Sequence, residues 1–307
     1  MSLLLLLACG GDHPLQPSLA VGEDPAFSSL PADVTLVGGG DIAAAMASPL
    51  GMALAARGLL DVEAVAEGAA ELGVSGWGGV VAGCGSGGCV GVAEGEVEAE
   101  KLSLAAEARG FELAREGERQ VVRAGGVPFA VQACCGLAEP RAKNVLFGDM
   151  PAVLAFGGTR VPADAFLDVV PAGDLWLAAR DADRLLDQAA IRLRAEGSPA
   201  GEEIALMLED PERARNTDLA RAVGFSVQTG ETSAFTLRVS CIDTGSARKV
   251  AWMLELALVE AKLTTPETLS AMLDTAEIYR NGDVVEARMT GTPEAWALAF
   301  TTQDVDL

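Results

Sequence analysis

The sequence predicts an α+β protein made of two tandem, weakly repeated units, residues 28–158 and 159–307. Three observations support this prediction: short strand-like segments, amphipathic helix-like segments, and the same order of both in each half. That order is β–α–(α)–β–β–α–β–β–α, which indicates an antiparallel sheet with helices packed on one face, related to the ferredoxin-like, split βαβ fold. With 307 residues, the chain is long enough for two domains of ordinary size.

The two halves begin alike. Residues 34–37 form an apolar strand-like run before three glycines, and Asp41 then caps a helix-like segment. In the second half, the strand-like residues 175–180 lead to Asp181, which precedes another amphipathic segment. We interpret the three glycines, residues 38–40, as a turn that allows close packing.

The two halves also end alike. A strand predicted at 144–148 precedes Pro151, and a strand predicted at 284–289 precedes Pro293. Each proline stands near the first position of a short predicted helix, where its missing N–H costs nothing. This similarity supports the division into two repeats.

The remaining predicted elements of the first half are strands at 77–82 and 90–93, a helix at 98–109, and strands at 111–116 and 127–133. Those of the second half are strands at 222–227 and 234–239, a helix from Ser246, and a hairpin over 276–289. The hairpin turns at Asn281-Gly282, the strongest short hairpin signal.

The predicted helix from Ser246 carries an apolar stripe that includes Val250, Leu254 and Leu258, with charged residues opposite. Large apolar residues at helical spacing predict further core positions: Met207, Met253, Met272 and Trp252. A ligand cleft between the two repeats is the alternative for these residues, because ligand sites favour domain interfaces.

The N-terminus predicts export. Residues 3–7 are five leucines, too few for a transmembrane helix but typical of a targeting segment. Leu6-Leu7-Ala8-Cys9 resembles the bacterial lipobox, in which the signal peptidase cuts before a cysteine that is then acylated. Residues 1–8 would be the signal segment, and residues 9–27, rich in Gly, Pro and acidic residues, a flexible tether.

Taken as a whole, the chain resembles bacterial lipoproteins of unknown function. The resemblance implies that Cys9 is the lipidated residue and that the protein partners the membrane through this anchor. It places the body in the bacterial cell envelope, in the periplasm or at the cell exterior. It implies no particular activity.

Five further cysteines are disulfide candidates, because export leads to an oxidising compartment: Cys84, Cys89, Cys134, Cys135 and Cys241. Cys84 and Cys89 bracket a four-residue glycine-rich loop between two predicted strands, so we expect them to pair. Cys241 could pair with Cys134 or with Cys135, and the sequence does not decide between them.

The segment 83–88 matches G-x-G-x-x-G, the pattern of a dinucleotide-binding loop. That function requires a helix to begin there, whereas the residues that follow predict a strand. A hairpin loop explains the glycines better, and no cofactor is predicted.

Charge and composition exclude several function classes. Against 44 Asp and Glu there are 22 Lys and Arg, a net charge of −22 that disfavours nucleic-acid binding. The single histidine, His13, lies in the tether, so the body has no histidine for a catalytic triad or a metal site. The sequence therefore predicts no catalytic residues, no metal ligands and no enzymatic activity.

These observations favour an exported, lipid-anchored, non-enzymatic binding or interaction protein. Its partner would be another envelope protein, or a small apolar ligand held between the repeats. Two alternatives remain: an assembly or structural component of the envelope, and a hydrolase that uses carboxylates or a metal ion.

Replacing the predicted lipidation residue, Cys9→Ala, should move the protein from the membrane fraction to the soluble fraction. Metabolic labelling with a fatty acid measures the acylation directly. Label that persists in the Cys9→Ala variant would contradict this prediction.

Overall fold

The computed structural model confirms an α+β architecture. It describes residues 25–60, 169–180, 219–265 and 267–302, together with Phe166 and, between 74 and 149, the strands and a few residues beside them. Twelve strands form one sheet: β1 (Leu36–Asp41), β3 (Gly79–Gly85), β4 (Gly88–Glu94), β6 (Glu112–Glu116), β7 (Arg119–Ala124), β8 (Val127–Cys135), β9 (Lys143–Asp149), β10 (Leu175–Arg180), β11 (Ala220–Gln228), β12 (Ser233–Cys241), β13 (Glu277–Asn281) and β14 (Val284–Gly291). A separate pair joins β2 (Val74–Ser75) to β5 (Glu96–Val97).

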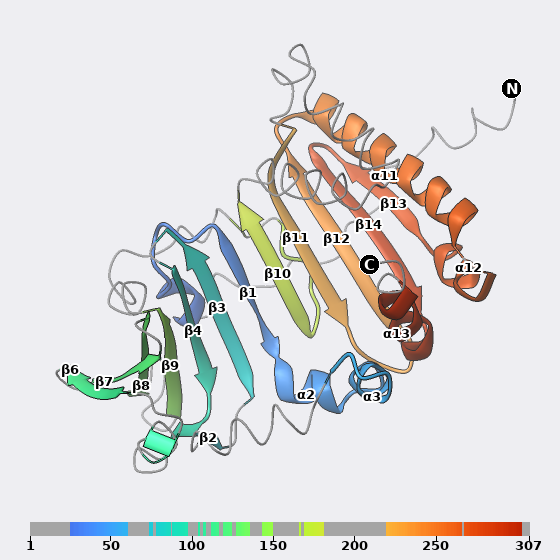
Figure 1. Ribbon diagram of the computed structural model, residues 1–307. Helices are drawn as coiled ribbons and strands as arrows, with labels where there is room; N and C mark the ends of the chain where they lie inside the picture. The colour runs from blue at the N-terminus through green and yellow to red at the C-terminus, as the bar shows by residue number, and fades with distance from the viewer. Residues whose placement is uncertain are drawn as a thin grey trace, which may run out of the picture.

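Both halves of the chain contribute to this single sheet, because their first strands pair with each other (Figure 1). The strand order is β13-β14-β12-β11-β10-β1-β3-β4-β9-β8-β7-β6. Outward from the β1–β10 pair, β10-β11-β12-β14-β13 on one side has the same order as β1-β3-β4-β9-β8 on the other. The repetition expected from the sequence is therefore present in the strand order, within one continuous sheet.

The glycines at 38–40 lie inside β1, not in the turn that the sequence suggested. They do allow close packing, as expected. A Cβ on Gly39 would lie 2.8 Å from the Trp176 ring and 2.6 Å from the carbonyl oxygen of Val80. Gly40 has φ +140°, a conformation that glycine adopts far more readily than other residues. The glycines let neighbouring strands and the indole approach β1.

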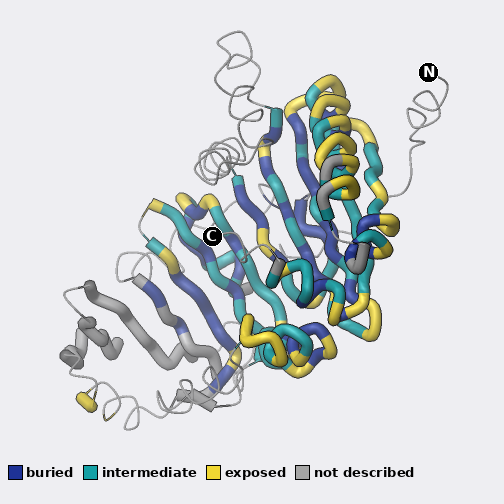
Figure 2. The backbone as a smooth tube through the Cα atoms, turned by 45° about the vertical axis from the view of Figure 1, so that its right-hand side comes forward, coloured by how far each residue is buried: buried dark blue, intermediate teal, exposed yellow. Residues whose placement is uncertain are grey.

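Apolar clusters pack on both faces of the sheet. The central strands are largely buried or half-buried (Figure 2). On one face, Phe27 of helix α1 (Pro25–Ser28), Phe166 and Val170 pack against β-strand residues that include Trp176 and Val90. On the other face, two clusters lie between the sheet and the helices, and one of them includes Leu50 from the first half of the chain.

A buried ion pair joins β12 to β14. Arg238 Nε and Nη2 donate to Glu286 Oε2 at 3.0 and 2.6 Å, and the two side chains are 1% and 0% exposed. Removing one partner of such a pair leaves a buried charge uncompensated, which costs about 3–5 kcal/mol. The pair therefore constrains which residues can face each other across these strands.

The helices on the second face come from both ends of the chain. Helix α11 (Thr244–Thr264) lies along β12, β13 and β14, followed by α12 (Glu267–Leu273) and α13 (Pro293–Thr302). From the first half, α2 (Ile42–Ala47) leads into α3 (Pro49–Ala56), which packs against α13 (Figure 1). Arg57 Nη1 donates a hydrogen bond to Thr301 Oγ1 at 3.2 Å.

Several boundaries differ from the sequence-based expectation. Phe27, assigned to the tether at 9–27, is fully buried, because the phenyl ring packs on Phe166 and Trp176. Strand β7 and helix α12 were not expected. The predicted helices after Asp181 and Pro151 lie outside the described residues, as does most of the one at 98–109.

The close contact at Gly39 leads to a stability prediction. Gly39→Ala should lower the free energy of unfolding by about 1–3 kcal/mol, because the new methyl group overlaps backbone that cannot move aside. Gly230→Ala is the control, since a Cβ there meets nothing nearer than 3.5 Å. Urea denaturation of both variants would measure the difference, and equal stabilities would contradict the prediction.

Candidate functional site

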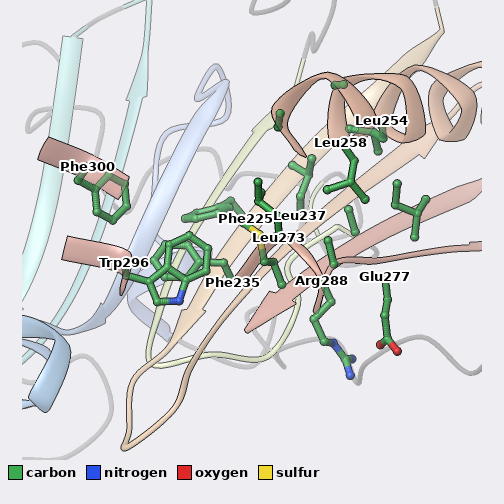
Figure 3. Close-up of a pocket in the computed structure, with 16 residues that line it drawn as sticks. Phe225, Phe235, Leu237, Leu254, Leu258, Leu273, Glu277, Arg288, Trp296 and Phe300 are labelled. Carbon is green, nitrogen blue, oxygen red and sulfur yellow. The ribbon is translucent and has the colours of Figure 1, made fainter. Parts of the chain in front are cut away.

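An apolar pocket of about 440 Å³ lies between the sheet and helices α11, α12 and α13 (Figure 3). Its volume is in the range of ordinary small-molecule sites. Its lining residues are Phe225, Phe235, Leu237, Leu254, Ala257, Leu258, Ala261, Leu273, Ala276, Glu277, Ile278, Ala287, Arg288, Met289, Trp296 and Phe300. All of them belong to the second half of the chain, so this pocket is not the cleft between repeats that the sequence suggested.

The way in which α11 packs explains where the pocket forms. Asp243 caps the helix by accepting a hydrogen bond from the Ser246 N–H at 2.7 Å, and this bond lowers the pKa of the Asp243 carboxyl. In the first half of the helix, Ala247 and Ala251 are buried against the sheet. Farther along, the sheet-facing Leu254 and Leu258 line the pocket instead of filling it.

Four aromatic rings form one wall. The rings of Phe235 and Trp296 lie 3.7 Å apart between centroids, and Phe225 and Phe300 lie 5.5 and 6.0 Å from Phe235. The indole N–H of Trp296 donates to the Ser233 carbonyl oxygen at 3.2 Å, so its polar atom is satisfied. The wall offers an apolar ligand flat, rigid surfaces.

The two charged lining residues are a cross-strand pair, Glu277 of β13 and Arg288 of β14. Figure 3 shows both charged ends turned away from the apolar side chains. Tyr279 donates a hydrogen bond to the Glu277 carboxylate, which raises the pKa of the tyrosine. Arg288 Nη2 lies 3.4 Å from Glu286 Oε1. Polar chemistry is therefore confined to one side of the pocket.

Such a site can hold an apolar molecule by burying its surface. Within the described part of the chain, no group of three or more His, Cys, Asp or Glu residues is arranged to hold a metal ion. The carboxylate of Glu286 is paired with Arg238.

The predicted disulfide between Cys84 and Cys89 is present. The two residues are direct partners on β3 and β4, with their Cα atoms 4.0 Å apart. The G-x-G-x-x-G segment is a hairpin, as predicted, but its loop is two residues shorter than expected because Gly85 and Gly88 also pair. Ser86 in this loop donates two hydrogen bonds to Asp33.

The predicted pairing of Cys241 with Cys134 or Cys135 is wrong. Cys241 is a free thiol, fully buried in β12. Six strands separate β12 from β8, which holds Cys134 and Cys135, so the residues lie on the order of 30 Å apart. The side chains of Cys134 and Cys135, and Cys9, lie outside the described residues.

The pocket could not be predicted from the sequence, because its lining residues have the same composition as a filled core. Met272 is buried, as expected of a core residue, but Trp252 is 54% exposed. The side of α11 opposite the sheet was expected to be charged, yet it carries Trp252, Leu256, Val259 and Leu263.

Comparison with known proteins yields similarity in fold alone. No family model and no curated protein matches the chain. Two crystal structures of a protein called TP0453 are similar over most of their length. Crystal form IV has a TM-score of 0.50 at 8% identity, covering 90% of this chain and 96% of that one. Crystal form I has a TM-score of 0.49 at 9% identity, covering 91% and 97%.

Among the described helices, none combines the length and the hydropathy that crossing a bilayer requires.

Burial of Cys241 leads to a prediction about its reactivity. Desolvation, helped by Asp283 and Asp243, raises the pKa of the thiol from 9.0 to about 11. At pH 8 its thiolate fraction should therefore fall about 100-fold, in addition to the steric protection of burial. Alkylation by iodoacetamide, followed by mapping of the Cys241 peptide, should be at least that much slower in the native protein than in urea.

The same shift predicts a pH dependence of stability. Since the folded-state pKa is the higher one, the unfolded chain ionises first, and stability is lost as the pH rises from 9 towards 11. The Cys241→Ala variant should lose this part of the dependence. Parallel stability curves for the two proteins above pH 9 would contradict it.

Proposed function

We propose that this protein is a lipid-anchored, non-enzymatic binding protein of the bacterial envelope, and that its pocket under α11 takes an apolar ligand. The main support for this proposal is the pocket, whose wall is almost entirely apolar. The lipobox-like Leu6-Leu7-Ala8-Cys9 supports the anchored location.

The energetics favour a ligand with an extended apolar part. Each methylene group transferred from water into the pocket contributes about 0.8 kcal/mol. Ten such groups supply about 8 kcal/mol, which corresponds to micromolar affinity before the cost of association is subtracted. An acyl chain or a comparable hydrocarbon satisfies this requirement, whereas a polar metabolite would leave its hydrogen bonds unmade against the wall.

Quenching of tryptophan fluorescence by bromostearate tests the proposal, because bromine quenches only nearby rings. Trp296 lines the pocket and Trp252 lies outside it on α11. We expect saturable quenching of the tryptophan emission. The amount of emission lost at saturation should decrease in Trp296→Phe and stay the same in Trp252→Phe. Equal quenching in both variants would argue against binding in this pocket.

A pocket-filling substitution provides a second, matched test. Ala261→Phe places a ring inside the pocket and should weaken bromostearate binding at least about tenfold. Ala271→Phe adds the same ring at an exposed position of α12 and should leave binding unchanged. Wild-type affinity in Ala261→Phe would refute the assignment of the ligand to this pocket.

A further inference from the structure

Helix α11 has a second apolar side, which faces away from the pocket. Trp252, Leu256, Val259 and Leu263 are 54, 43, 55 and 81% exposed. Their spacing of four, three and four residues is that of the a and d positions of a heptad repeat. The row, here called the outer α11 stripe, is about 16 Å long at 1.5 Å per residue.

Opposite charges flank the outer α11 stripe on one side. Glu255 precedes Leu256, and Lys262 precedes Leu263, so the two charges occupy equivalent positions one heptad apart. Lys262 Nζ lies 3.0 Å from Asp274 Oδ1, with side chains 37 and 65% exposed. An ion pair this exposed contributes little to stability, so it does not prevent Lys262 from meeting another carboxylate.

We propose that the outer α11 stripe is the contact between two copies of this chain, with their α11 helices antiparallel. In that arrangement Leu256 lies opposite Val259 of the second copy, and Trp252 opposite Leu263 of the second copy. The same register sets Glu255 beside Lys262 of the second copy. Two-fold symmetry repeats each contact, giving four apolar layers and two ion pairs.

The chemistry of the stripe favours a second copy over a lipid surface. A stripe confined to a and d positions is the narrow seam of a helix pair, whereas membrane-surface helices have a broad apolar face and a basic polar face. Four side chains per copy form a small interface, so we expect a reversible dimer with a dissociation constant on the order of 10–100 µM.

Sedimentation velocity of the full-length chain, made with Cys9→Ala so that no acyl group contributes, tests the proposal at 150 mM salt. At that ionic strength the repulsion between two negative bodies is screened beyond about 8 Å. The wild-type surface should dimerise across 5–500 µM. Leu256→Glu should abolish the dimer without changing the thermal midpoint, because Leu256 is exposed.

Charge variants test the register. Glu255→Lys alone and Lys262→Glu alone should each weaken the dimer at least about fivefold, since like charges then meet. An equimolar mixture of the two variants should restore it, because every Lys then faces a Glu. Asp274→Asn removes only the internal ion pair and should leave the dimer intact.

Three outcomes would overturn the proposal: a monomer at all concentrations, a dimer that survives Leu256→Glu, or a mixture that associates no better than either variant. If the monomeric chain instead bound phosphatidylglycerol vesicles and lost this binding in Trp252→Ser, the stripe would face lipid.

Discussion

The structure depends on the hydrogen-bonded pairing of β1 with β10. Without it, the two halves of the chain would be separate sheets, each with an exposed inner edge that could pair with other chains. The pairing requires a residue without a side chain in the middle of β1, because Trp176 of β10 lies against Gly39 and leaves no room for a Cβ there. Once the sheet is continuous, the core around Phe27 and Phe166 can span both halves, and α3 reaches α13 across the other face.

Helix α11 determines where apolar surface lies on the second face of the sheet. Alanines hold the start of the helix close to β12 and β14, while larger side chains farther along border an unfilled volume. The opposite side of the same helix is also apolar, so α11 separates two hydrophobic surfaces. The two surfaces differ in shape: one is a concave pocket and the other a convex stripe on the outside of the helix.

Local signals explain what could be predicted from the sequence. Alternating residues identified the strands, and the spacing of Cys84 and Cys89 identified their disulfide. The hairpin expected at Asn281-Gly282 is present, but its turn is Gly282-Asp283, because Asn281 still pairs with Val284. Features that depend on contacts between distant parts of the chain could not be predicted from such local signals. The distance between Cys241 and Cys134 depends on strand order, and whether Leu258 packs in a core or borders a pocket depends on the helix-to-sheet separation. Trp252 was assigned to a core because it is large and apolar, although helical periodicity puts it about 200° from Leu254, on the opposite side of α11.

The β1–β10 pair also has a kinetic consequence. Leu36 pairs with Ala179, about 140 residues later in the chain, so the centre of the sheet closes only after most of the polypeptide has been made. Closing so long a loop is entropically costly, and proteins dominated by such distant contacts fold slowly. During synthesis, the β1 edge of the first half remains open until β10 arrives. The protein therefore passes through a stage in which its own central strand is the surface most prone to incorrect pairing.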